Sequence, residues 1–174
     1  GYILSSQGVT TVTDMGEDVS DKYGDIFRSA MAQGFKNRAS AYCSWRFVQQ
    51  QGDAVVTNDP DFMGDGRFRL VGVKMIADGS VSGRTAWCDV PYLPADDASG
   101  EAEYGMPVCT EEDIKEALDF CRKNKCQLSI HCMGARAIDR AVDLTWEEKP
   151  WMDDARIPSV RLEHVAMPTP QARP

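Results

Sequence analysis

Residues 68–77 read Phe68-Arg69-Leu70-Val71-Gly72-Val73-Lys74-Met75-Ile76-Ala77. The run is almost entirely apolar and holds several β-branched residues, which is typical of a strand buried on both faces. Asp78 and Gly79 follow directly and end the apolar pattern. Strands buried on both faces belong mainly to parallel sheets, so this run predicts an α/β fold.

Comparable strand-like runs lie on both sides of this one. They cover residues 8–14, 38–45, 127–131 and 159–165. Helical patterns over residues 20–34 and 135–146 separate some of them. A further helix should begin after Thr110, because Thr110-Glu111-Glu112-Asp113 forms a capping-box pattern. This alternation predicts a parallel sheet with right-handed crossovers.

Two segments do not fit the alternation. Residues 78–108 are polar and rich in glycine and proline. A connection of about 30 residues is long for a compact domain, where ~4–6 is usual, and such loops tend to be lids or substrate loops. The proline-rich residues 168–174 are predicted to form an irregular tail after one domain over residues 1–167.

The composition disfavours several classes of protein. The 174 residues are 43% hydrophobic, which suits one globular domain. A net charge of −8 argues against nucleic acid or anionic lipid as a partner. No apolar run reaches the ~18 residues of a membrane span. The six cysteines are scattered and form no C-x-x-C pair, which favours free buried thiols in a reducing cytoplasm.

The candidate functional residues lie at strand ends. His131 and His164 each end an apolar run, and Lys74 sits inside another. The carboxyl ends of strands in a parallel α/β barrel converge on one site, and imidazoles there are metal-ligand types. The alternative for each histidine is a neutral ring hydrogen-bonded in the core. Lys74 leaves three roles open: a carboxylated metal bridge, a Schiff-base former, or an ion-pair partner of Asp78 or Asp89.

Glu163 precedes His164 directly. Neighbouring residues of a strand point to opposite faces, so only one of the two is expected to line the site. A buried Glu163 would need a cation, and Arg161 points the same way.

Four stretches together resemble the amidohydrolase superfamily, in the family-3 branch that includes N-substituted formamide deformylase-like enzymes. They are Gly8 to Gly16, Val73 to Ala86, Ile130 to Ala137 and Arg161 to His164. The resemblance implies a metal-dependent hydrolase of amide or related C–N bonds on a TIM-type (β/α)8 barrel. This chain would supply about strands two to six, as a partial barrel.

The resemblance also implies roles for individual residues. Lys74, His131 and His164 fall on metal-site positions and would be both metal ligands and catalytic residues. The metal would be divalent, with zinc expected, as one or two ions. Residues expected to bind a small amide-type substrate are Asp78, Arg84, Tyr92 and Arg136.

The chain departs from the family pattern in two ways. It contains no H-x-H pair and nothing after the sixth strand, so we expect an internal fragment with weak or no activity. Ala135 stands where the family usually has an aspartate. Five strands cannot close a barrel, which predicts homo-oligomers through unpaired sheet edges. Two alternatives remain: a non-catalytic α/β module with a vestigial metal site, and a Schiff-base barrel enzyme using Lys74.

Overall fold

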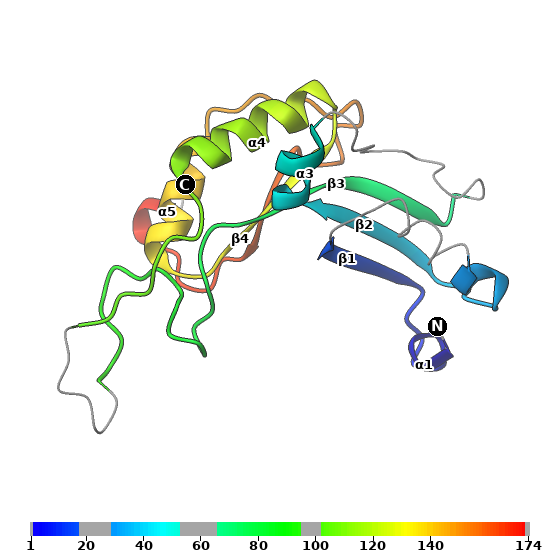
Figure 1. Ribbon diagram of the computed structural model, residues 1–174, viewed down its shortest axis with the longest axis horizontal. Coiled ribbons are helices and arrows are strands. Elements are labelled where there is room, and N and C mark those ends of the chain that lie inside the picture. Colours follow the sequence, from blue (N-terminus) through cyan, green and yellow to red (C-terminus); the bar gives the residue numbers. More distant parts are fainter. Residues whose placement is uncertain (1, 18–28, 53–65, 95–101, 173–174) are drawn as a thin grey trace.

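The computed structural model describes residues 2–17, 29–52, 66–94 and 102–172. Five parallel strands form one sheet in the order β1-β2-β3-β4-β5. The strands are β1 (Thr11–Glu17), β2 (Arg38–Ser44), β3 (Phe68–Ile76), β4 (Gln127–Cys132) and β5 (Val160–His164). The helices are α1 (Tyr2–Ser6), α3 (Trp45–Gln51), α4 (Glu111–Lys123), α5 (Ala135–Thr145) and the 3-10 turn η2 (Pro170–Ala172). The sheet curls into a partial α/β barrel, as predicted (Figure 1).

The strands lie close to their predicted positions, with one shift. β1 begins at Thr11 rather than near Gly8, because Gly8 has a φ of 78° and turns the chain after α1. The helix predicted over residues 20–34 falls mostly outside the described residues, which show helix at 29–32. The tail contains the short η2 turn, so the prediction of an entirely irregular tail is wrong. The amide of Ala172 donates to Thr169 Oγ1 there.

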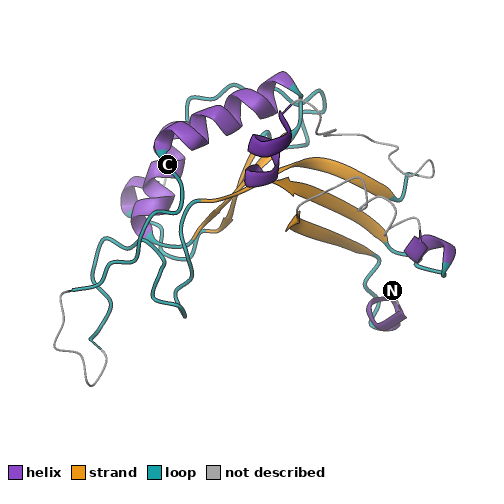
Figure 2. Ribbon diagram, in the orientation of Figure 1, coloured by secondary structure: helices purple, strands orange, loops and turns teal. Residues whose placement is uncertain are grey.

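Helices cover one face of the sheet (Figure 2). α4 begins with the predicted capping box, in which Thr110 and Asp113 exchange hydrogen bonds. Its buried residues join Met75 and Ile130 from the sheet in one core. None of the six cysteines forms a disulfide, and five of them are buried, as the sequence predicted. The helix-covered face is therefore apolar and closed.

The opposite, concave face carries a row of polar side chains. The register aligns Lys74 with Ser129 and Ser129 with Arg161. Two residues further along β4 and β5, His131 is aligned with Glu163. Register partners in a parallel sheet point to the same face, so these side chains from three strands share one surface. The curl of the sheet leaves this surface on its inner side (Figure 1).

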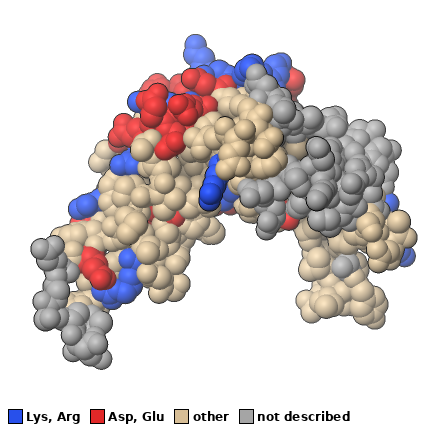
Figure 3. Space-filling model, viewed as in Figure 1, with Lys and Arg blue, Asp and Glu red and all other residues tan. Residues whose placement is uncertain are grey.

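The outer surface shows where the charge of the chain lies. Acidic side chains gather over α4, whose first turn holds Glu111, Glu112 and Asp113 (Figure 3). Acids at a helix N-terminus oppose the positive end of its dipole, so they stabilise α4. Within the described ranges, no helix has both the length and the apolar character needed to cross a membrane.

Candidate functional site

The two histidines meet where β4 and β5 end. Their ring centroids lie 4.6 Å apart, with an interplanar angle of 71°. Along a regular strand His164 would point away from the face that Glu163 occupies. His164 instead has a φ of 72° and Val165 a φ of 45°, so the strand breaks there and the ring turns toward His131. The expectation that only one of Glu163 and His164 reaches this site is wrong for that reason.

His131 has a defined hydrogen-bond partner. Its Nε2 lies 2.9 Å from the carbonyl oxygen of Gly79. A carbonyl only accepts hydrogen bonds, so the contact places the imidazole proton on Nε2. The lone pair on Nδ1 then remains for a ligand, which is the arrangement of metal-binding histidines whose other nitrogen bonds a carbonyl.

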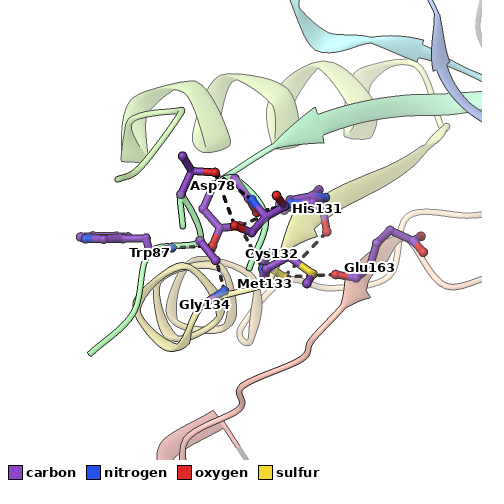
Figure 4. Close-up of polar contacts among 12 residues, drawn as sticks. Asp78, Trp87, His131, Cys132, Met133, Gly134 and Glu163 are labelled. Carbon is purple, nitrogen blue, oxygen red and sulfur yellow. Dashed lines mark hydrogen bonds and ion pairs between the residues drawn. The ribbon is translucent and has the colours of Figure 1, made fainter. Parts of the chain in front are cut away.

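Asp78 lies beneath this contact and is 0% exposed. Its carboxylate accepts hydrogen bonds from the backbone amides of Trp87 (2.9 Å), Met133 (2.9 Å) and Gly134 (2.8 Å) (Figure 4). Its Oδ1 also lies 3.6 Å from Nε2 of His131. The sequence analysis expected Asp78 to bind substrate, and the geometry is that of an acceptor of backbone amides behind the site.

Lys74 is buried on the concave face, with 6% of its surface exposed. Burial lowers its pKa below 10.5, and the negative charge of Glu163 opposes that shift. Gly16 of β1 lies against its stem: a Cβ on Gly16 would come within 2.9 Å of Lys74 Cγ. The side chain therefore depends on a glycine for its space and has an amine that loses its proton more readily than a free lysine does.

A polar network links Lys74's neighbours across the concave face. Ser129 Oγ donates to Glu163 Oε1 at 2.9 Å, and Arg161 Nη2 lies 3.0 Å from the same oxygen. Arg161 is thus the cation that a buried Glu163 was expected to need. Arg161 also donates to the hydroxyl of Tyr42, which donates to Gln127.

Sequence reasoning missed part of this network, namely Tyr42, Gln127 and Ser129. A signal for two of them was present. Gln127, Ser129 and His131 alternate along β4, so the period-2 pattern places them on one face. Tyr42 carried no such signal, because its partners come from two other strands.

The remaining predicted substrate-binding residues lie in or against the long loop. Arg84 donates to Glu103 Oε2 and to the carbonyl of Leu93, both at 2.8 Å, and lies 5.3 Å from the ring centre of Tyr92. Tyr92 donates to the carbonyl of Ala86, and burial raises its pKa to about 12. These contacts hold the loop together, and a substrate role for either residue stays a prediction.

Arg136 at the start of α5 lies 4.9 Å from the ring centre of Tyr104. Arg140, one turn later, lies 4.2 Å from the ring centre of Trp87 and donates to the carbonyl of Cys109. Both arginines therefore fasten the loop to α5. A substrate role for Arg136 stays a prediction as well.

The donor set suits a divalent metal in part. Among the described residues, no three side chains of His, Cys, Asp or Glu come together as a metal-binding group. The rings of His131 and His164 nevertheless lie in contact, and the hydrogen bond of His131 Nε2 leaves the lone pair on its Nδ1 for a ligand. Imidazole pairs suit zinc, and Lys74 on the same face is the third donor predicted from the sequence.

Comparisons with known proteins identify a matching family and solved structures with a similar fold. The family described as the amidohydrolase family matches residues 4–174. An uncharacterized metal-dependent hydrolase from Pyrococcus furiosus superposes with a TM-score of 0.64 at 24% identity, covering 84% of this chain and 29% of that one. A second, from Pyrococcus horikoshii OT3, gives 0.62 at 23% identity, covering 82% of this chain and 28% of that one. A comparison with curated protein sequences found no match. The chain thus spans less than a third of the solved structures it resembles.

Proposed function

Because this chain belongs to the amidohydrolase family, we propose that it carries part of the active site of a metal-dependent hydrolase acting on amide or related C–N bonds. The observation that carries the proposal is the contact between the rings of His131 and His164 at two adjacent strand ends. Within the family, the branch of N-substituted formamide deformylase-like enzymes is the one whose motifs the sequence resembles.

In this proposal the two imidazoles and Lys74 hold the metal. His131 binds through Nδ1, since Nε2 bonds the Gly79 carbonyl. When bound, a divalent metal such as zinc polarises a substrate carbonyl and lowers the pKa of a coordinated water to about 7. Lys74 has a lowered pKa, which favours the neutral amine that a ligand or a carboxylated bridge requires.

Glu163 and Arg161 form an ion pair on the concave face beside the proposed metal ligands. Arg161 balances the carboxylate of Glu163, and Ser129 fixes one of its oxygens. Glu163 also contributes the largest influence that keeps Lys74 protonated. Arg84, Tyr92 and Arg136 would contact a small amide substrate, whereas Asp78, buried behind the site, would hold the loop that carries Trp87.

Metal content tests the proposal. The chain produced in zinc-supplemented medium should retain zinc after gel filtration, measured by mass spectrometry of the metal. His131→Ala and His164→Asn should each lose most of it, whereas the exposed control Lys149→Ala should not. Asparagine is chosen at position 164 because it tolerates a positive φ. Equal zinc in the wild type and both histidine variants would refute the metal site.

A second candidate function uses Lys74 as a Schiff-base former. Its burial and lowered pKa favour it, because a neutral amine attacks carbonyls. Borohydride treatment in the presence of an aldehyde or ketone would then leave a stable adduct on Lys74, detected by peptide mass spectrometry. Trapping at Lys74 would support this candidate and count against the metal-bound lysine.

Association of copies is part of the proposal as well. β1 and β5 are the edge strands of the sheet, and open edges pair readily with other strands. We therefore propose that the isolated chain forms homo-oligomers through these edges, in the cytoplasm. Light scattering coupled to gel filtration measures this directly, and a strictly monomeric chain at high concentration would contradict it.

A further inference from the structure

Helix α5 begins without a side-chain cap of its own. Its N-cap residue is Gly134, which has no side chain to accept a hydrogen bond from the first amides. A larger residue cannot take its place easily, because a Cβ there would come within 2.3 Å of the carbonyl oxygen of Trp87. The carbonyl of Trp87 takes that role by accepting from the amide of Arg136 at 3.1 Å, and the carboxylate of Asp78 holds the amides of Met133 and Gly134 just before the helix.

The same carboxylate joins three parts of the chain. Asp78 follows β3, Met133 and Gly134 link β4 to α5, and Trp87 belongs to the long loop. Asp78 is fully buried, and a buried charge remains only where its hydrogen bonds are satisfied. Three amide donors at 2.8–2.9 Å meet that requirement. Asp78 therefore fixes these segments relative to one another.

His131 lies next to two segments that Asp78 holds, at Gly79 and at Met133. Gly79, the residue after Asp78, supplies the carbonyl that bonds His131 Nε2 at 2.9 Å. The Gly79 amide donates to the carbonyl of Thr85, so both the amide and the carbonyl of Gly79 are hydrogen-bonded. Met133, two residues after His131, is held by Asp78 itself. Both the ring's partner and the backbone after the ring thus depend on one carboxylate.

We propose that Asp78 is a positioning residue for His131. Asp78 holds the Gly79 carbonyl in place, so that the His131 ring keeps its proton on Nε2 and its lone pair on Nδ1. The value of this arrangement for metal binding rests on the proposed function, but the arrangement itself does not. Residues that orient a ligand histidine in this way commonly change metal affinity about 10- to 100-fold when they are replaced.

The test uses the fact that the chain has only two histidines. Nitrogen-15 labelling of histidine gives two ring spin systems, and His164→Asn assigns them. In the metal-free wild type, at a pH where the rings are neutral, His131 should be the Nε2–H tautomer. Asp78→Asn should give a mixture of tautomers, because an amide group cannot accept from all three amide donors. The control Asp89→Asn should match the wild type, because Asp89 is exposed and its carboxylate accepts from the amide of the next residue, Val90.

Two results would overturn the proposal. One is a wild-type His131 protonated on Nδ1 or exchanging between tautomers, which is decisive even where Asp78→Asn does not fold. The other is a folded Asp78→Asn with an unchanged Nε2–H tautomer. Zinc titration distinguishes a failure of the Asp78 proposal from a failure of the proposed metal site. A wild type that binds no zinc refutes only the metal site, and a zinc dissociation constant raised about 10- to 100-fold in Asp78→Asn supports both.

Discussion

The imidazole of His164 lies edge-on to that of His131, with ring centroids 4.6 Å apart, because the backbone of His164 leaves the strand conformation at a φ of 72°. Two side chains that strand alternation would separate are thereby brought together at the end of β4 and β5. Non-glycine residues seldom adopt this φ, and a strained residue of this kind is often found at a functional site. The pairing is the basis for a shared ligand site.

Removal of the Asp78 carboxylate should cost stability. Asp78→Ala leaves one buried and two part-buried amides without acceptors, which predicts a loss of about 3–5 kcal/mol in the free energy of unfolding. Urea unfolding followed by circular dichroism measures the loss. Asp89→Ala, at an exposed position, is the control and should change little. A loss below about 0.5 kcal/mol for Asp78→Ala would show that the amides find other partners.

A methyl group at position 134 should disturb the contact between α5 and the loop. Gly134 has a φ of −82°, so alanine is strained there only by its Cβ, which would lie 2.3 Å from the Trp87 carbonyl oxygen. Gly134→Ala should lose about 1–3 kcal/mol, as overpacked sites do. The control is Gly83→Ala, whose Cβ would lie 3.0 Å from the Ser80 hydroxyl, 3.4 Å from the Thr85 hydroxyl and 3.9 Å from the Ser80 carbonyl oxygen. Equal stability of the two variants would contradict the tight contact.

Neutralising Glu163 should lower the pKa of Lys74 further. Burial already holds this pKa below 10.5, and Glu163 is the largest influence against the shift. Glu163→Gln removes that influence and leaves burial and Arg161 to favour the neutral amine. An NMR titration of the Lys74 side chain measures the pKa, with the exposed Glu116→Gln as control. A pKa that is unchanged or higher in Glu163→Gln would show that the two groups do not interact.

The fold should weaken in alkaline solution. Burial raises the pKa of Cys43 from 9.0 to about 12, and that of Cys132 to about 12. The unfolded chain loses these protons near pH 9.0 while the folded chain keeps them, so the unfolding free energy falls as pH rises above that value. Lys74, with its lowered pKa, acts in the opposite direction as a single group.

Urea midpoints measured on both sides of pH 9.0 test this expectation. Cys43→Ser should make the decline shallower, because serine does not ionise in this range. Midpoints that stay constant or rise through pH 9.0 would mean that the buried thiols do not govern alkaline stability.

The strands could be predicted because buried parallel strands have a distinctive composition. The run of β3 is apolar on both sides except for Arg69 and Lys74, whereas β2 and β4 alternate polar residues with small or apolar ones. Lys74 was noticeable in sequence because a lysine is rarely found in such a run. Its placement on the concave face beside Ser129 follows directly from the register.

The rest depends on contacts that sequence patterns do not encode. The turn of the His164 ring comes from a positive φ at a residue that is not glycine, which alternation cannot anticipate. Asp78 was expected to contact substrate, and its partners Trp87 and Gly134 lie 9 and 56 residues away in the sequence. The ion pair of Arg84 with Glu103 could not be predicted from the sequence either, and the expected substrate role of Arg84 stays a prediction.

The central claim is that one metal ion is bound by His131 and His164 together. Zinc titration calorimetry of the wild type, His131→Ala, His164→Asn and the double variant tests it as a double-mutant cycle. If both rings hold the same ion, each single substitution should weaken binding nearly as much as the double one. Additive losses, or zinc affinity that persists in the double variant, would contradict a shared site.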